Sequence, residues 1–277
     1  MNFRIVADSS SDVLSLDRVE FASAPLKILT SKKEYTDNAD LDVKGMAEDM
    51  KSLSEASKTS CPSVGDWLDA FGDADFVFCC TITSHLSGSY NSACVAAEEY
   101  MSEHPERKAY VIDSLSTGPE MGLIIEKLEQ GIVDGKDFET LCTEIEQYKK
   151  TTGLLFVLES LRNLANNGRV KKTVARLAGV LGIRLVGRAS IDGELEPLDK
   201  IRGEKRALEG VYSRMKQEGF AGGRVKIGHC NNEIAAKTVR SHILAEFPKC
   251  DIEIYHLRGL CSFYAEMGGI LIGFEKN

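Results

Sequence analysis

The chain has 277 residues, enough for one large or two medium domains, and its 43% hydrophobic and 27% charged residues are ordinary for a globular protein. Its net charge of −8 argues against nucleic acid binding, which needs dense positive charge, and its eight cysteines contain no CxxC pair that would indicate structural zinc. No apolar run approaches the roughly 20 residues that span a bilayer, so we expect a cytoplasmic protein with reduced thiols.

The first half of the chain alternates short apolar runs with helical patterns, which is typical of a parallel α/β fold. We expect strands at residues 3–7, 26–29, 76–82 and 109–112, and helices at residues 42–57, 63–71, 89–101, 118–130 and 137–149. Ser63 is the expected N-cap of the second helix, because Asp66 stands at its third position. The apolar run at 76–82 is typical of a strand buried on both faces.

The pattern changes near Thr151, where we place a domain boundary between residues 1–151 and 152–277. Beyond it we expect strands at 154–158, 183–186, 225–229, 252–256 and 270–274, and an extended segment at 193–200. Helices are expected up to residue 166 and at 170–181, 202–217 and 233–247. Since no low-complexity linker separates the two domains, we expect them to pack against each other.

The familiar catalytic motifs are missing from the sequence. It contains no dinucleotide-binding GxGxxG after a strand, no P-loop, no HExxH and no GxSxG. The five histidines form no cluster with the spacing of metal ligands. The sequence therefore predicts no metal, no cofactor and none of the common enzyme classes.

Three hydroxyl-rich loops, at residues 8–12, 59–63 and 84–89, stand next to predicted strands or helix starts. Ligands of open α/β sheets bind at the carboxyl ends of the strands, and helix amino ends favour anions. The loops therefore suit a small oxyanion such as a carboxylate or a phosphate. Ser and Thr are also ordinary helix caps, so a purely structural role for each loop stays open.

At these loops the sequence resembles the DegV family. The matching segments are DSSSD, TSCPS, SHLSGSY and VIDSLSTGPEMG in the first half, and LESLRNLANNGRV and DGELEPLDKIRGEKRALE in the second. The resemblance implies two α/β domains. The first would be a three-layer α/β/α domain with a mostly parallel sheet, and the second a two-layer domain with a mixed sheet.

The resemblance also implies a function. DegV proteins hold a long-chain fatty acid in an apolar pocket, and some present it to the kinase subunit of bacterial fatty acid kinase without catalysing a reaction themselves. By motif position, the implied carboxylate ligands are Thr59, Ser60, Ser87, Gly88 and Ser89. Arg169 follows from the Asn-Gly-Arg turn, and Lys200 and Arg202 are candidates for the pocket mouth or the kinase-facing surface. Transient membrane contact is compatible with such a role.

The tail departs from the family pattern HxGPG. Tyr264 occupies the His position and Glu266 the first Gly position. A tyrosine hydroxyl still donates a hydrogen bond, but Glu266 near the head group would repel a carboxylate unless it points away or is protonated. Cys61 also stands where Gln is common. Two alternatives therefore stay open: a lipid or small-ligand sensor that has lost kinase coupling, and an enzyme that binds a phosphate or carboxylate substrate.

Overall fold

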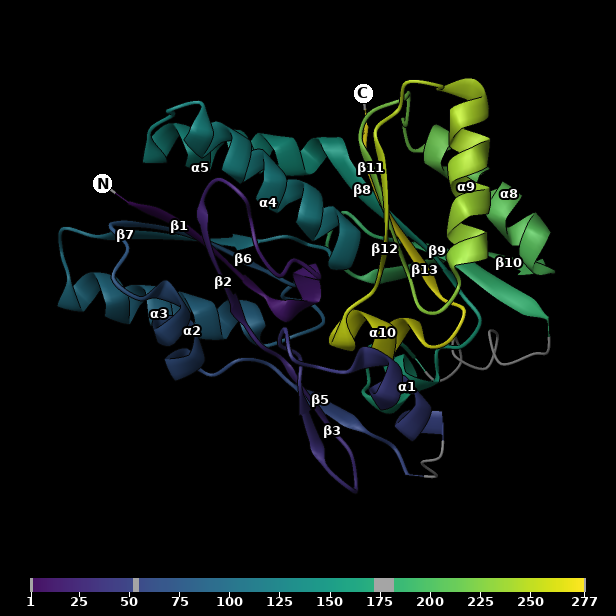
Figure 1. Cartoon of the computed structure of the whole chain (residues 1–277), viewed down its shortest axis with the longest axis horizontal. Coiled ribbons are helices and arrows are strands. Elements are labelled where there is room, and N and C mark those ends of the chain that lie inside the picture. Colours follow the sequence, from purple (N-terminus) through teal and green to yellow (C-terminus); the bar gives the residue numbers. More distant parts are fainter. Residues whose placement is uncertain (1, 52–54, 172–181, 277) are drawn as a thin grey trace.

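The computed structural model describes residues 2–51, 55–171 and 182–276, and its strands form three sheets (Figure 1). Sheet A is parallel throughout, in the order β2 (Glu20–Ala24), β1 (Phe3–Asp8), β6 (Phe76–Thr81) and β7 (Lys108–Asp113). Helices α2 (Val64–Phe71) and α3 (Ser89–Glu103) cover one face, and α4 (Gly118–Val133) and α5 (Phe138–Tyr148) cover the other. This is the three-layer arrangement that was predicted.

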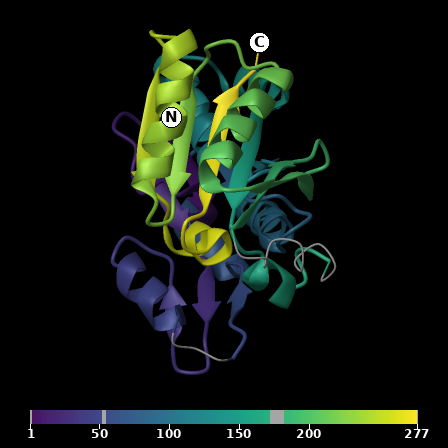
Figure 2. The same cartoon turned by 90° about the vertical axis from the view of Figure 1, so that its right-hand side faces the viewer.

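Sheet C is mixed. Its order is β10 (Leu195–Arg202), β9 (Ile183–Ala189), β8 (Thr152–Leu158), β13 (Ile270–Glu275), β11 (Val225–His229) and β12 (Ile252–His256), with only the last two strands parallel. Helices α8 (Glu204–Gln217) and α9 (Glu233–Glu246) cover one face (Figure 2). The predicted fold class is confirmed. The domain boundary at residue 151 stays a prediction; the strands of sheet A precede it, and those of sheet C follow it.

A third sheet, B, was not predicted, although one of its strands lies within the strand expected at residues 26–29. It is antiparallel, in the order β4 (Glu34–Thr36), β3 (Lys27–Leu29) and β5 (Lys58–Ser60), and it lies beside helix α1 (Val43–Lys51). Helix α10 (Gly259–Ala265), also unpredicted, packs against α1 and β3, and α6 (Arg162–Asn166) follows β8. Single turns of 3-10 helix stand at Ser9–Ser11 and Lys149–Thr151.

Three predicted helices differ from the described structure or lie outside it. The helix expected at 42–57 begins at Val43 and is described to Lys51, and residues 55–57 are not helical but lead into β5. The helix expected from residue 202 starts at Glu204, because Arg202 still pairs with Ile183 in sheet C. The helix expected at 170–181 lies almost wholly on residues 172–181, outside the described residues.

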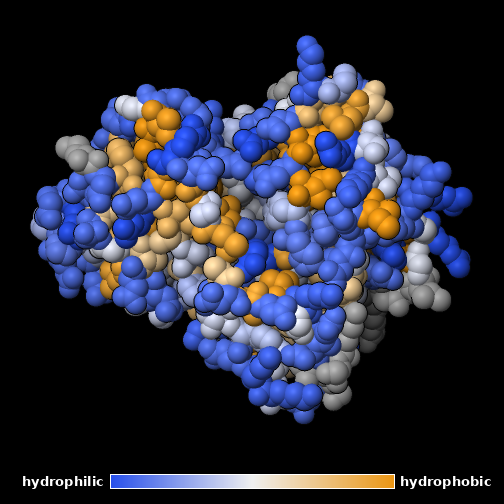
Figure 3. Space-filling view, viewed as in Figure 1, coloured by the Kyte–Doolittle hydropathy of each residue, from blue (hydrophilic) through white to orange (hydrophobic). Residues whose placement is uncertain are grey.

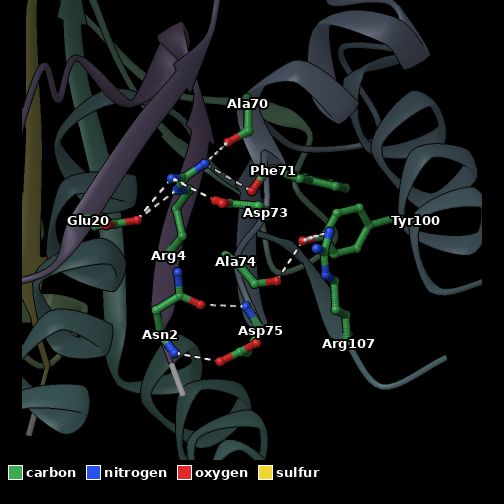
Figure 4. A network of polar contacts seen from close by, with 10 residues as sticks. All are labelled: Asn2, Arg4, Glu20, Ala70, Phe71, Asp73, Ala74, Asp75, Tyr100 and Arg107. Carbon is green, nitrogen blue, oxygen red and sulfur yellow. Dashed lines mark hydrogen bonds and ion pairs between the residues drawn. The ribbon is translucent and has the colours of Figure 1, made fainter. Parts of the chain in front are cut away.

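A polar network joins the amino ends of the strands of sheet A (Figure 4). The Arg4 guanidinium donates to the Phe71 carbonyl (3.1 Å) and pairs with the Glu20 carboxylate (2.9 Å). Asn2 and Asp75 exchange two hydrogen bonds of 2.9 and 2.7 Å between side chain and backbone. This network fixes the edge of the sheet opposite the hydroxyl-rich loops, so it supports the fold at a distance from the candidate site.

The surface is mainly hydrophilic on the face shown in Figure 3, and its hydrophobic patches are separate from one another. Among the described helices, none combines the length and the apolar character needed to cross a membrane.

Candidate functional site

A cavity of about 260 Å³ lies where two of the three hydroxyl-rich loops, 59–63 and 84–89, meet sheet C and α10, whereas the loop at 8–12 is not part of its wall. Its first wall comes from the TSCPS segment and from the loop between β6 and α3, at the carboxyl end of sheet A. This is the edge at which ligands of open α/β sheets bind. Residues from both halves of the chain line it, so the cavity exists only in the assembled molecule.

The second wall is apolar and comes mainly from β8. Leu154, Phe156 and Leu158 face the cavity, whereas Leu155 and Val157 face the core under α8 and α9. Side chains alternate across a strand, so one run, LLFVL, supplies both the core and the cavity wall. The sequence predicts this run only as a strand, although apolar residues on both of its faces already indicate two separate packing surfaces. Leu271, Leu260 and Cys261 are further members of the cavity lining.

At one end of the cavity, Thr59 Oγ1 and Tyr264 Oη lie 2.7 Å apart. Burial raises the pKa of Tyr264, and the Thr59 hydrogen bond and the Arg169 charge partly offset this rise. The phenol therefore stays neutral at physiological pH, and its hydroxyl can donate to a ligand oxygen.

Ser60, Ser87 and Gly88 line the same end. The Ser87 hydroxyl oxygen accepts the Ser89 backbone N–H (3.2 Å), so its own proton remains available for a ligand. A Cβ on Gly88 would stand 3.3 Å from Cys61 Sγ, so the missing side chain lets the two loops approach closely. Five of the residues named from the sequence therefore line one cavity, and their role as ligands of a carboxylate stays a prediction.

Ser89 lies elsewhere. It is fully buried, is not part of the cavity wall, and its hydroxyl donates to the Asp8 carboxyl at 2.6 Å. Asp8 also accepts the Ile82 backbone N–H at 2.9 Å, and burial raises its pKa. Ser89 therefore joins α3 to β1 and β6 behind the site.

The predicted basic residues also separate in space. Arg169 lines the cavity, and its Nε donates to the Leu86 carbonyl at 2.8 Å, which holds the loop that carries Ser87. Lys200 and Arg202 are exposed on β10 and are not part of the cavity wall.

A family model described as an uncharacterised protein of the DegV family matches residues 2–277. The chain belongs to the DegV family. A DegV domain-containing protein of Streptococcus pneumoniae is 43% identical over 279 residues, covering 99% of each chain.

Two crystal structures of DegV proteins are closely similar to this chain. The S. pneumoniae fatty acid kinase (Fak) B3 protein, loaded with linoleic acid, has a TM-score of 0.98 at 43% identity, and the match covers 100% of each chain. A DegV family protein from Eubacterium eligens, loaded with heptadecanoic acid, has a TM-score of 0.97 at 42% identity, covering 99% of this chain and 100% of that one.

Glu266, the unusual acid in this DegV sequence, points away from the cavity. Its carboxylate accepts the Asn163 backbone N–H at 3.0 Å, in the first turn of α6, and it is not part of the cavity wall. A carboxylate at a helix amino end is stabilised by the helix dipole. The repulsion considered from the sequence is thus avoided, because Glu266 caps a helix.

Proposed function

We propose that the cavity binds a long-chain fatty acid, with its carboxylate at Thr59, Ser60, Ser87, Gly88 and Tyr264. The protein then presents this carboxylate to a fatty acid kinase subunit and performs no chemistry itself. The observation that carries the proposal is an apolar cavity whose polar end gathers hydroxyl donors beside Arg169. The two relatives with fatty acids in their crystal structures support it.

The physical chemistry of the cavity fits this ligand. Each methylene removed from water contributes roughly 0.8 kcal/mol, so the wall formed by Leu154, Phe156 and Leu158 supplies most of the affinity. Hydrogen bonds to a charged group contribute about 1.5–3 kcal/mol each. The hydroxyls therefore set the orientation of the ligand and keep its carboxylate at the loop end.

The proposal includes a surface on β10 that faces the kinase subunit. Lys200 and Arg202 project from β10 as exposed cations, suited to an acidic partner or to its nucleotide. Since the phosphoryl donor of such a kinase is ATP, we place the protein in the cytoplasm.

Native mass spectrometry of the purified protein tests the first step. We expect bound acyl chains, or uptake of labelled palmitate by delipidated protein. If the purified protein carries no lipid and the delipidated protein takes up no palmitate, the proposal is wrong. Adding a bacterial fatty acid kinase subunit and ATP tests the second step, and we expect acyl phosphate that hydroxylamine traps. Lipid binding without acyl phosphate would favour the sensor role instead.

A further inference from the structure

Helix α6 and the turn that follows it are hydrogen-bonded to each of the three segments that carry hydroxyls at the polar end of the cavity. These segments are β5 with Thr59, the loop with Ser87, and α10 with Tyr264. None of them is adjacent to α6 in the sequence. The contacts come from side chains of α6 and its turn, and from Glu266, the acid that stands at a glycine position of the family pattern.

Two hydrogen bonds join α6 to α10. The Glu266 carboxylate, at the end of α10, accepts the Asn163 backbone N–H at 3.0 Å. The side-chain amide of Asn163 donates to the Phe263 carbonyl at 2.8 Å. Phe263 and Glu266 flank Tyr264 in the sequence, so these two bonds restrict where the Tyr264 phenol can lie.

The carboxyl end of α6 holds the other two segments. The side-chain amide of Asn167 donates at 3.1 Å to the carbonyl of Ser57, two residues before Thr59. The backbone carbonyl of Asn167 accepts a hydrogen bond from Arg169 Nη1, and Arg169 Nε donates to the Leu86 carbonyl in the loop between β6 and α3 at 2.8 Å. One short helix therefore connects the three segments that supply the hydroxyls.

The backbone at Glu266 is strained, which indicates a role for its side chain. Its φ of 54° and ψ of 175° lie in a region that essentially only glycine adopts without strain. A glutamate here lowers stability relative to the glycine of the family pattern. The hydrogen bond to Asn163 is the contact that a glycine would not make.

We propose that Glu266, Asn163 and Asn167 are positioning residues of the carboxylate site. Through α6 they fix the distances among the hydroxyls of the three segments, so that these hydroxyls reach the two oxygens of one carboxylate. The inference rests on the proposed function. An alcohol head group needs fewer donors and carries no charge, and its acyl chain binds the same apolar wall. Loss of positioning should therefore weaken the binding of an acid more than that of the matching alcohol.

Titration of the full chain with palmitic acid and with hexadecanol tests this role. Glu266→Gly relieves the strained backbone but removes the acceptor, so the affinity for palmitic acid should fall about fivefold and that for hexadecanol less than about twofold. Glu266→Gln keeps an acceptor oxygen and should restore the wild-type ratio of the two affinities. Asn167→Ala should behave like Glu266→Gly. Asn166→Ala, at an exposed position of the same helix, is the matched control.

Two results would overturn the inference while leaving fatty acid binding intact. In the first, Glu266→Gly and Asn167→Ala both keep the wild-type ratio of acid to alcohol affinity. In the second, both affinities fall together and Glu266→Gln does not restore them, as expected of a general loss of structure. If the wild-type protein binds no palmitic acid, or binds it no more tightly than hexadecanol, the proposed carboxylate site itself is wrong.

Discussion

Thr59 Oγ1 and Tyr264 Oη lie 2.7 Å apart, although 205 residues separate them in the sequence. Thr59 belongs to β5 of sheet B, and Tyr264 belongs to α10, between two strands of sheet C. The polar end of the cavity is therefore built by a contact between the two halves of the chain. Removing either hydroxyl should therefore lower the affinity for the ligand more than it lowers the free energy of unfolding.

We predict that Tyr264→Phe weakens palmitic acid binding about fivefold, because it removes one donor of about 1 kcal/mol and leaves Thr59 without this partner. Displacement of a fluorescent fatty acid measures the change. Tyr212→Phe is the matched control, since its hydroxyl contacts Glu246 on the far side of sheet C. Equal affinities of the wild-type protein and Tyr264→Phe would exclude the phenol from the site.

For Ser87→Ala we predict a loss of affinity that depends on the head group. Palmitic acid should bind about tenfold more weakly, because a hydrogen bond to a carboxylate is lost. The affinity for hexadecanol, which carries no charge, should fall much less. Isothermal titration of both ligands on both proteins measures the difference. An equal loss for acid and alcohol would show that Ser87 shapes the cavity without binding the carboxylate.

The parts of the fold that the sequence predicted well are those with long, uniform signals. The apolar run at 76–82 became β6, and Ser63 with Asp66 forms a reciprocal capping box at the start of α2. Of sheet B only β3 was predicted, as the strand at residues 26–29; β4 and β5 escaped prediction because three residues are too few to show a periodicity. Helix α10 escaped because most of its positions are buried, which removes the amphipathic pattern.

The candidate site divides in the same way. Thr59, Ser60, Ser87 and Gly88 line the cavity, as expected of residues in hydroxyl-rich loops that the resemblance had singled out, while their part in ligand binding stays a prediction. The direction in which the Glu266 side chain points could not be predicted, because it depends on a hydrogen bond from Asn163, 103 residues away in the sequence. The destination of the Ser89 hydroxyl likewise depends on Asp8, at the end of another strand. Contacts of this kind follow from the packed fold and not from local spacing.

Asp37 holds α10 in place, so we predict that Asp37→Ala destabilises the protein by about 2–6 kcal/mol. Its carboxyl, 2% exposed, accepts the backbone N–H groups of Gly259 and Leu260 at 2.8 Å each. The substitution leaves both donors buried without this partner, at about 1–3 kcal/mol each. Urea unfolding measures the loss, with exposed Asp40→Ala as control. A loss below 1 kcal/mol would contradict this anchoring role.

Asp12 should make stability depend on pH. Burial, together with the charge of Asp37, raises its pKa to about 8, although the Arg258 backbone N–H opposes this rise. Between pH 4 and 8 the folded chain therefore keeps a proton that the unfolded chain has released. The free energy of unfolding then falls as pH rises through this window, by at most about 1.4 kcal/mol per pH unit.

Asp12→Asn does not titrate and tolerates the positive φ of 61° at this position, so its stability should fall less between pH 5.5 and 8. Urea unfolding at both values measures the difference, and parallel pH profiles for the two proteins would contradict a raised Asp12 pKa.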